Sequence, residues 1–268
     1  MDSEKKSLLA WVALATVIVV AAVLHMQSDY RDSLLRDKYL AEDFCPSEIA
    51  DLQSHTVFLL DFSDSIKEEM VSEKIKEQVI SHREGLPDGG KLSALFINAD
   101  SYDEIYAVCK LTLPRTQNPN WKCGDPLYGI DAAKEAEAKR YCNFAEQMQK
   151  LVEDVVDRSK GEFPSSPLIE VVADVSMKPD FQSVEKREII LFSDLLQNTN
   201  EYSFYPDRGP APNAKSVFAK ESIDLAGTEI VVYQIPRKSH RTRQEKAKTF
   251  WKDLFNLAGV EVPFRSIE

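Results

Sequence analysis

Residues 56–65 read TVFLLDFSDS, a short apolar run that ends at Asp61 and continues into a polar turn. The run over 56–60 has the length and the Val and Phe content of a buried strand. Strands that are apolar throughout are typical of parallel sheets, because helices cover both faces of such sheets. The segment therefore predicts an α/β domain in which residues 56–60 form the first strand.

Strand-like and helical segments alternate along the rest of the chain. The expected strands are 92–98, 106–113, 189–192 and 230–235, and the expected helices are 66–83, 131–157, 167–175 and 243–257, the last capped by Gly259. Turn residues mark loops at 85–90, 114–128 and 198–212. This alternation predicts a Rossmann-like, open and mainly parallel sheet with helices on both faces.

An uncharged apolar stretch lies near the N-terminus. Residues 8–26, LLAWVALATVIVVAAVLHM, contain no Asp, Glu, Lys or Arg. At ~1.5 Å per residue, a helix of this length spans roughly the ~30 Å core of a bilayer. A signal peptide is the alternative, but its apolar part is typically ~7–15 residues long and ends at a small-residue cleavage site. We expect a tail at 1–7, a transmembrane helix at 8–26, a juxtamembrane helix and linker at 27–54, and a soluble domain at 55–268.

The charges that flank this stretch bear on its orientation. Lys5 and Lys6 precede it, and Arg31, Arg36 and Lys38 follow it, so the count of positive charges is nearly balanced. The very short N-terminal tail is typical of a signal anchor. We therefore expect the domain on the extracytoplasmic side.

Charge and cysteine content limit the classes of partner and of metal site. The formal net charge of −11 over 268 residues disfavours nucleic acid as a partner. Cys45, Cys109, Cys123 and Cys142 form no CxxC pair, which disfavours a structural zinc site. We expect buried or free thiols, and a Cys109–Cys123 disulfide is the alternative for a domain outside the cytoplasm.

Oxygen-bearing side chains follow two of the expected strands. Asp61, Ser63 and Ser65 have the spacing Asp-x-Ser-x-Ser directly after the first strand, and Asp194 follows the strand at 189–192. Ser166 precedes the helix at 167–175. Ligands of open parallel sheets bind beyond the carboxyl ends of the strands, where these side chains would meet. Hard oxygen ligands suit Mg²⁺ or Mn²⁺.

This pattern resembles the von Willebrand factor A fold with a variant metal-ion-dependent adhesion site, and the resemblance covers residues 55–260. Asp61, Ser63 and Ser65 match the first motif, Ser166 stands for a threonine, and Asp194 matches the last aspartate. Leu195 stands where the family usually has glycine. The resemblance implies metal-assisted protein recognition, in which a partner's acidic side chain completes the coordination sphere.

Simpler interpretations of the same residues remain open. Ser65 and Glu68 have the spacing of a helix capping box, which needs no metal. Asp194 is equally typical of a residue that starts a loop. The aromatic residues 250, 251 and 255 are expected to pack on the sheet. The basic stretch at 237–243 is read as a solvated loop in preference to a contact with an acidic partner or with lipid headgroups.

An enzymatic function has weaker support than a binding function. Asp61 occupies the nucleophile position of phosphatases of the haloacid-dehalogenase type, but those enzymes need a second Asp where this chain has Ser63. No nucleophile elbow, phosphate-binding loop or paired His spacing occurs. We predict a membrane-anchored scaffold or adaptor that binds a partner protein through a divalent cation. The alternatives are a metal-dependent phosphohydrolase using Asp61 and a metal-free interaction domain.

Overall fold

The computed structural model describes residues 52–61, 69–87, 89–97, 102–109, 122–125 and 165–267, and six single residues between 135 and 153. Those six residues are helical, which agrees with the helix expected at 131–157. In the part of the chain that the structure describes, no helix has the length and apolar content needed to cross a membrane. The expected transmembrane and juxtamembrane helices lie outside it.

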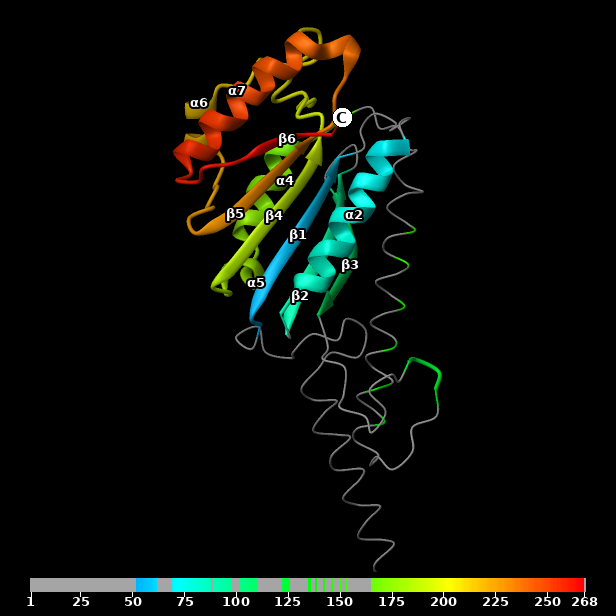
Figure 1. Cartoon of the computed structure of the whole chain (residues 1–268). Helices are drawn as coiled ribbons and strands as arrows, with labels where there is room; N and C mark the ends of the chain where they lie inside the picture. Colours follow the sequence, from blue (N-terminus) through cyan, green and yellow to red (C-terminus); the bar gives the residue numbers. More distant parts are fainter. Residues whose placement is uncertain are drawn as a thin grey trace, which may run out of the picture.

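The described strands form one sheet in the order β3-β2-β1-β4-β5-β6 (Figure 1). The strands are β1 (Ser54–Asp61), β2 (Gly90–Ile97), β3 (Tyr102–Cys109), β4 (Lys186–Ser193), β5 (Thr228–Gln234) and β6 (Phe264–Ser266). Every neighbouring pair is parallel except β2 with β3. The prediction of an open, mainly parallel sheet is therefore confirmed.

β3 corrects one expected strand. The sequence predicted a strand at 106–113, whereas β3 begins at Tyr102 and runs antiparallel to β2. The direction follows from the connection, because β2 ends at Ile97 and leaves only a short link before β3. A parallel crossover needs about a dozen residues or more. β3 is thus an antiparallel edge strand on an otherwise parallel sheet.

Helices lie on both faces of the sheet, as predicted (Figure 1). They are α2 (Glu69–Gly85), α4 (Leu168–Met177), α5 (Pro179–Gln182), α6 (Ala214–Lys220), the 3₁₀ turn η2 (Lys238–His240) and α7 (Arg241–Leu257). α2, α4 and α7 match expected helices. α5, α6, η2 and β6 were not expected, because each is too short to give a clear periodic pattern.

The alternating side chains of β1 divide the core into two layers. Val57 and Leu59 pack in the layer that contains α4, α6 and α7, and Phe58 and Leu60 pack in the layer that contains α2. All four side chains are at most 1% exposed. Each contributes roughly 1.5–3 kcal/mol by leaving water. The expected packing of residues 250, 251 and 255 is confirmed, since all three are buried in the α7 layer.

The cysteines correct a second expectation. Cys123 forms a disulfide with Cys142, with their Cα atoms 5.5 Å apart, and Cys109 is also disulfide-bonded. No described cysteine is free. The expected free thiols are therefore wrong, and so is a Cys109–Cys123 pair. Cysteine spacing does not fix connectivity, because the fold decides which thiols meet.

An ion pair fastens α2 to the sheet near the amino-terminal end of β4. His82 of α2 places Nε2 3.3 Å from Oε1 of Glu188, and its Nδ1 lies 2.8 Å from the Gln78 carbonyl oxygen. Thr56 of β1 donates a hydrogen bond to the same carboxylate at 3.0 Å. Both ring nitrogens thus face acceptors, which favours the doubly protonated imidazolium. Burial lowers the pKa of His82, but the hydrogen bonds and the charges of Glu188 and Glu229 raise it above its usual value overall.

Replacing His82 should weaken the fold in a pH-dependent way. A group whose folded pKa is raised contributes its full stability below the unfolded pKa of about 6.5 and loses it as pH rises through the folded pKa. We expect His82→Gln to lower the free energy of unfolding by roughly 1–2 kcal/mol near pH 6, and by less as pH rises. Urea unfolding of wild type and His82→Gln, at pH values from about 6 upward, measures the difference in their free energies of unfolding.

Glu188→Gln is the matched control for this prediction. It removes the carboxylate that holds the proton on His82, so the pH dependence should flatten in the same window. A difference between wild type and His82→Gln that stays constant over the range would show that the imidazole is not charged in the folded protein.

Candidate functional site

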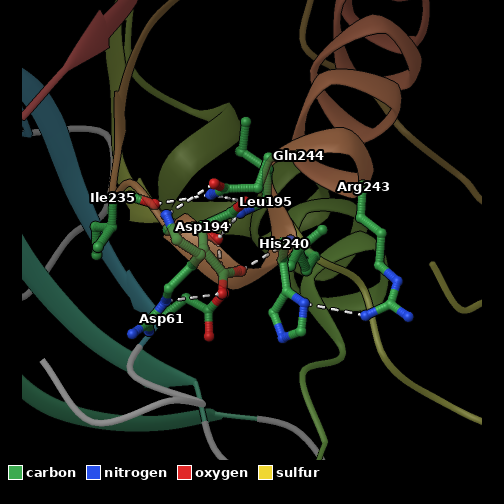
Figure 2. A network of polar contacts seen from close by, with 10 residues as sticks. Asp61, Asp194, Leu195, Ile235, His240, Arg243 and Gln244 are labelled. Atoms are coloured by element: carbon green, nitrogen blue, oxygen red, sulfur yellow. Dashed lines mark hydrogen bonds and ion pairs between the residues drawn. The ribbon is translucent and has the colours of Figure 1, made fainter. Parts of the chain in front are cut away.

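The carboxyl ends of β1 and β4 bring two of the predicted aspartates together. The two strands are parallel neighbours, with Leu60 opposite Phe192, so Asp61 ends β1 beside Ser193 at the end of β4. Ser193 Oγ donates a hydrogen bond of 2.6 Å to Asp61 Oδ2. Asp194 follows immediately, and both aspartates are 2% exposed. Their convergence at one edge of the sheet agrees with the expectation from the sequence (Figure 2).

Both carboxylate oxygens of Asp194 already accept hydrogen bonds within the protein. Oδ1 accepts from the backbone N–H of Leu196 at 2.9 Å, which is the loop-starting role that the sequence also allowed. Oδ2 accepts from Nε of Arg237 at 3.2 Å, and this contact is an ion pair. Arg237, which follows β5, was not among the predicted site residues. Asp194 therefore carries a built-in positive partner.

Ser166 is fully buried, with 0% exposure. Its backbone N–H donates to the Asn198 carbonyl at 3.1 Å, and the Asn198 N–H donates back to the Ser166 carbonyl at 3.0 Å. This bridge fixes Ser166 against the loop that follows Asp194. The Ser166 Oγ has no hydrogen-bond partner among the described residues. A buried hydroxyl without a partner costs roughly 1–3 kcal/mol, so this atom calls for an explanation.

The two other predicted ligands, Ser63 and Ser65, lie outside the described residues, as does the capping-box alternative at Ser65 and Glu68. Among described residues, no three His, Cys, Asp or Glu side chains gather as metal ligands would. The oxygens that remain at the edge are the carboxylates of Asp61 and Asp194 and the Ser166 hydroxyl. Such a set suits a hard cation and does not suit zinc in a structural site.

Leu195 adopts the backbone conformation of a glycine. Its φ is 70°, the only positive value among the described non-glycine residues. Such a conformation costs a non-glycine residue about 1–2 kcal/mol. Its N–H donates to Ser193 Oγ at 2.7 Å, and its carbonyl accepts from Trp251 Nε1 at 3.1 Å. The side chain is fully buried in the α7 layer, so burial offsets the strain.

Gln244 of α7 joins the ends of β4 and β5, a role that sequence reasoning missed. Its Nε2 donates to the carbonyl of Asp194 at 3.1 Å and to the carbonyl of Ile235 at 2.8 Å (Figure 2). Its Oε1 accepts from the Arg237 backbone N–H at 2.8 Å. A signal was present, because Gln244 lies three residues before buried Ala247 on the apolar face of α7. A polar residue on that face indicates a buried hydrogen-bond partner.

Comparisons with known proteins found matches among solved structures. No protein-family model and no curated protein matches the chain. Similar solved structures include proximal thread matrix protein 1 from the mussel byssus with a zinc-occupied MIDAS motif, at 16% identity over 81% of this chain and 45% of that one, with a TM-score of 0.37. A von Willebrand factor type A protein from Catenulispora acidiphila is 13% identical over 76% of this chain and 43% of that one, with a TM-score of 0.34.

The von Willebrand factor A domain of SpRpn10 is also similar, at 10% identity over 81% of this chain and 89% of that one, with a TM-score of 0.31. This chain spans less than half the length of the mussel and Catenulispora proteins. Because these TM-scores are low, the fold is described by the strand order and pairing given above and not by these matches.

Leu195 gives a test of the backbone at this edge. Leu195→Ala and Leu195→Gly should both destabilise the protein, by about 2–5 kcal/mol, because each removes a buried side chain. Glycine should nevertheless be about 0.5–1 kcal/mol more stable than alanine, since only glycine adopts a positive φ without strain. Urea unfolding of the two variants measures the sign of the difference.

Leu196 supplies the matched control. It is 1% exposed and is not among the residues with positive φ. Leu196→Gly should therefore be less stable than Leu196→Ala, as at ordinary positions. The same order at both positions would contradict the left-handed conformation of Leu195.

Proposed function

We propose that this chain is a membrane-anchored protein-interaction module, a scaffold or adaptor and not an enzyme, which binds a partner protein at the carboxyl edge of its sheet. The observation that carries the proposal is the meeting of Asp61 and Asp194 at one edge, with the partnerless Ser166 Oγ on a loop tied to the same edge. Buried polar atoms are normally paired, so an unpaired one beside an acidic edge favours a ligand.

The ligand proposed for this edge is a divalent cation, Mg²⁺ or Mn²⁺. Asp61, Ser63, Ser65, Ser166 and Asp194 would hold it. The donor set fits, because all five residues offer hard oxygens and Ser166 would gain the partner it lacks. Asp194 keeps acceptor capacity beside Arg237, since each carboxylate oxygen has two lone pairs. When bound, the cation would supply a position for an acidic side chain of the partner.

A metal-free contact at the same edge is the second candidate, and the Arg237–Asp194 ion pair favours it. The guanidinium already neutralises one carboxylate and would repel a dication nearby. The phosphohydrolase alternative has less support. Asp61 is almost completely buried and accepts a hydrogen bond from Ser193, and both features make it a poor nucleophile.

Ser166→Ala separates the two candidates. Removing the Ser166 hydroxyl breaks no hydrogen bond to a described residue, so the variant should be as stable as wild type, or slightly more stable, in EDTA. With Mg²⁺ or Mn²⁺ at about one hundred times its dissociation constant, wild type should gain roughly 2.7 kcal/mol and Ser166→Ala much less. Thermal unfolding of the full chain with increasing metal measures both.

Ser54→Ala is the control, because the Ser54 Oγ is also buried without a partner but lies at the opposite end of β1. It should keep the full response to metal, whereas Asp61→Ala should lose it. Equal responses of Ser54→Ala and Ser166→Ala would argue against a cation at this edge, and an absent response in wild type would leave the metal-free contact.

We further propose that residues 8–26 span the membrane and that the domain lies on the extracytoplasmic side. The Cys123–Cys142 disulfide supports this side, because disulfides persist in oxidising compartments and are rare in the cytosol. The apolar length of the segment supports the anchor.

Topology can be tested on the full chain in intact cells. An impermeant protease should digest the domain without lysis, and alkaline carbonate should leave the chain in the membrane. Ile18→Arg with Val19→Arg should release it, because each charge at mid-membrane costs about 2.5–3.5 kcal/mol, whereas Ile18→Leu should not. Digestion only after lysis would place the domain in the cytoplasm.

A further inference from the structure

Three basic side chains, Lys238, Arg241 and Arg243, form a positively charged surface that we call the basic rim. They lie on η2 and on the first turn of α7, directly after the segment that carries Arg237. Lys238 and Arg241 are exposed, and Arg243 is half-buried. Unlike Arg237, none of the three forms an ion pair with a carboxylate within the described residues.

The basic rim does not stabilise the helix on which it stands. The first turn of α7 contains no acidic residue, and its N-cap, His240, makes no side-chain capping hydrogen bond. The amino-terminal end of a helix carries a partial positive charge, which favours anions and disfavours cations. Glu245 follows Arg241 by one turn but forms no ion pair with it. The cations therefore oppose the local field, and an anion bound from outside would relieve this repulsion.

Part of the rim is held in a fixed position. The Arg243 guanidinium lies 4.9 Å from the centre of the Tyr205 ring, and its Nη1 lies 3.0 Å from His240 Nδ1 (Figure 2). The His240 and Tyr205 rings meet edge to face, with centroids 5.5 Å apart. A side chain that is already ordered loses less entropy when it binds. The guanidinium fork of Arg243 is thus prepared for a planar anion such as a carboxylate.

The rim is continuous with the proposed binding edge. Arg237 contacts Asp194 through its side chain and Gln244 through its backbone, and Lys238 is the next residue along the chain. Gln244 also lies beside Arg243 in sequence, so one short segment reaches from the acidic edge to the basic rim. A partner that approaches Asp61 and Asp194 would meet these cations as well.

We propose that the basic rim docks an acidic segment of a partner protein, whose carboxylates pair with Lys238, Arg241 and Arg243. The inference rests on the proposed function only in taking this edge as the binding face, and it needs no metal. A narrow peptide can contact the three cations of the rim directly, and charges beyond a Debye length of about 8 Å are largely screened. A broad anionic membrane would also meet the chain's net charge of −11, which repels it. The chemistry therefore favours an acidic peptide over a lipid surface.

The test uses the full chain in phosphatidylcholine nanodiscs and a fluorescein-labelled peptide of alternating Glu and Gly, with a Lys–Gly peptide for comparison. Fluorescence anisotropy at low salt should show binding of the Glu–Gly peptide and no binding of the Lys–Gly peptide. Lys238→Glu, Arg241→Glu and Arg243→Glu together should weaken binding at least about tenfold. Added salt should weaken binding to wild type.

A second triple variant serves as a control because it has the same net charge as the rim variant. Lys76→Glu, Lys186→Glu and Lys252→Glu reverse three cations outside the rim, of which Lys186 begins β4 and Lys252 lies about 16 Å along α7 from Arg241. This variant should change binding less than about twofold. The milder change of all three rim residues to Gln, checked by circular dichroism, covers the case in which the Glu variant fails to fold.

Several results would overturn the proposal. An equal loss of peptide binding in the two triple variants would mean that only net charge matters. An absence of peptide binding to wild type would show that the rim is not a binding surface for acidic segments. Retained peptide binding in the rim variant, with loss of its attachment to vesicles containing phosphatidylserine, would assign the rim to lipid. Repeating the measurement in EDTA separates the two proposals, because the rim should bind without metal even if no cation binds at Asp61.

Discussion

β1 lies between β2 and β4 and pairs with both in parallel, so its side chains are packed on both faces of the sheet. The register between β1 and β4 places Asp61 beside Ser193 at the carboxyl edge, where the Ser193 hydroxyl donates a hydrogen bond of 2.6 Å to the Asp61 carboxylate. A slip of one residue would turn each side chain of β1 to the other face and exchange Val57 and Leu59 for Phe58 and Leu60. The two hydrophobic layers thus fix the register, and the register fixes where the carboxylates meet.

The loop after β4 shows how the fold holds that edge in place. Leu195 takes a strained conformation because three constraints meet there: the Ser193 hydroxyl holds its N–H, Trp251 holds its carbonyl, and its side chain fills the core. Gln244 then ties the Asp194 carbonyl to the end of β5. α7 therefore does more than cover the sheet. It sets the backbone on which Asp194 is presented.

The sequence predicted the parts of this arrangement that depend on local pattern. β1 and β4 were expected because each is a short apolar run of strand length, and the convergence of Asp61 and Asp194 followed from the rule for parallel strand ends. The direction of β3 was missed although the short link after Ile97 implied it. The Cys123–Cys142 pairing and the Arg237–Asp194 ion pair join residues distant in sequence, so no periodic signal announces them.

Charge at the carboxyl edge follows from the same packing. Buried Asp61 and Asp194 lie side by side, and burial of two carboxylates without compensation would be very costly. Arg237 forms an ion pair with Asp194, and Ser193 donates a hydrogen bond to Asp61. Three further cations, Lys238, Arg241 and Arg243, follow Arg237 in sequence on η2 and α7, and none of them forms an ion pair with a carboxylate in the part of the chain that the structure describes. A protein whose net charge is strongly negative thus has a cluster of cations close in sequence to the arginine that pairs with buried Asp194, and this arrangement suits a partner that brings carboxylates of its own.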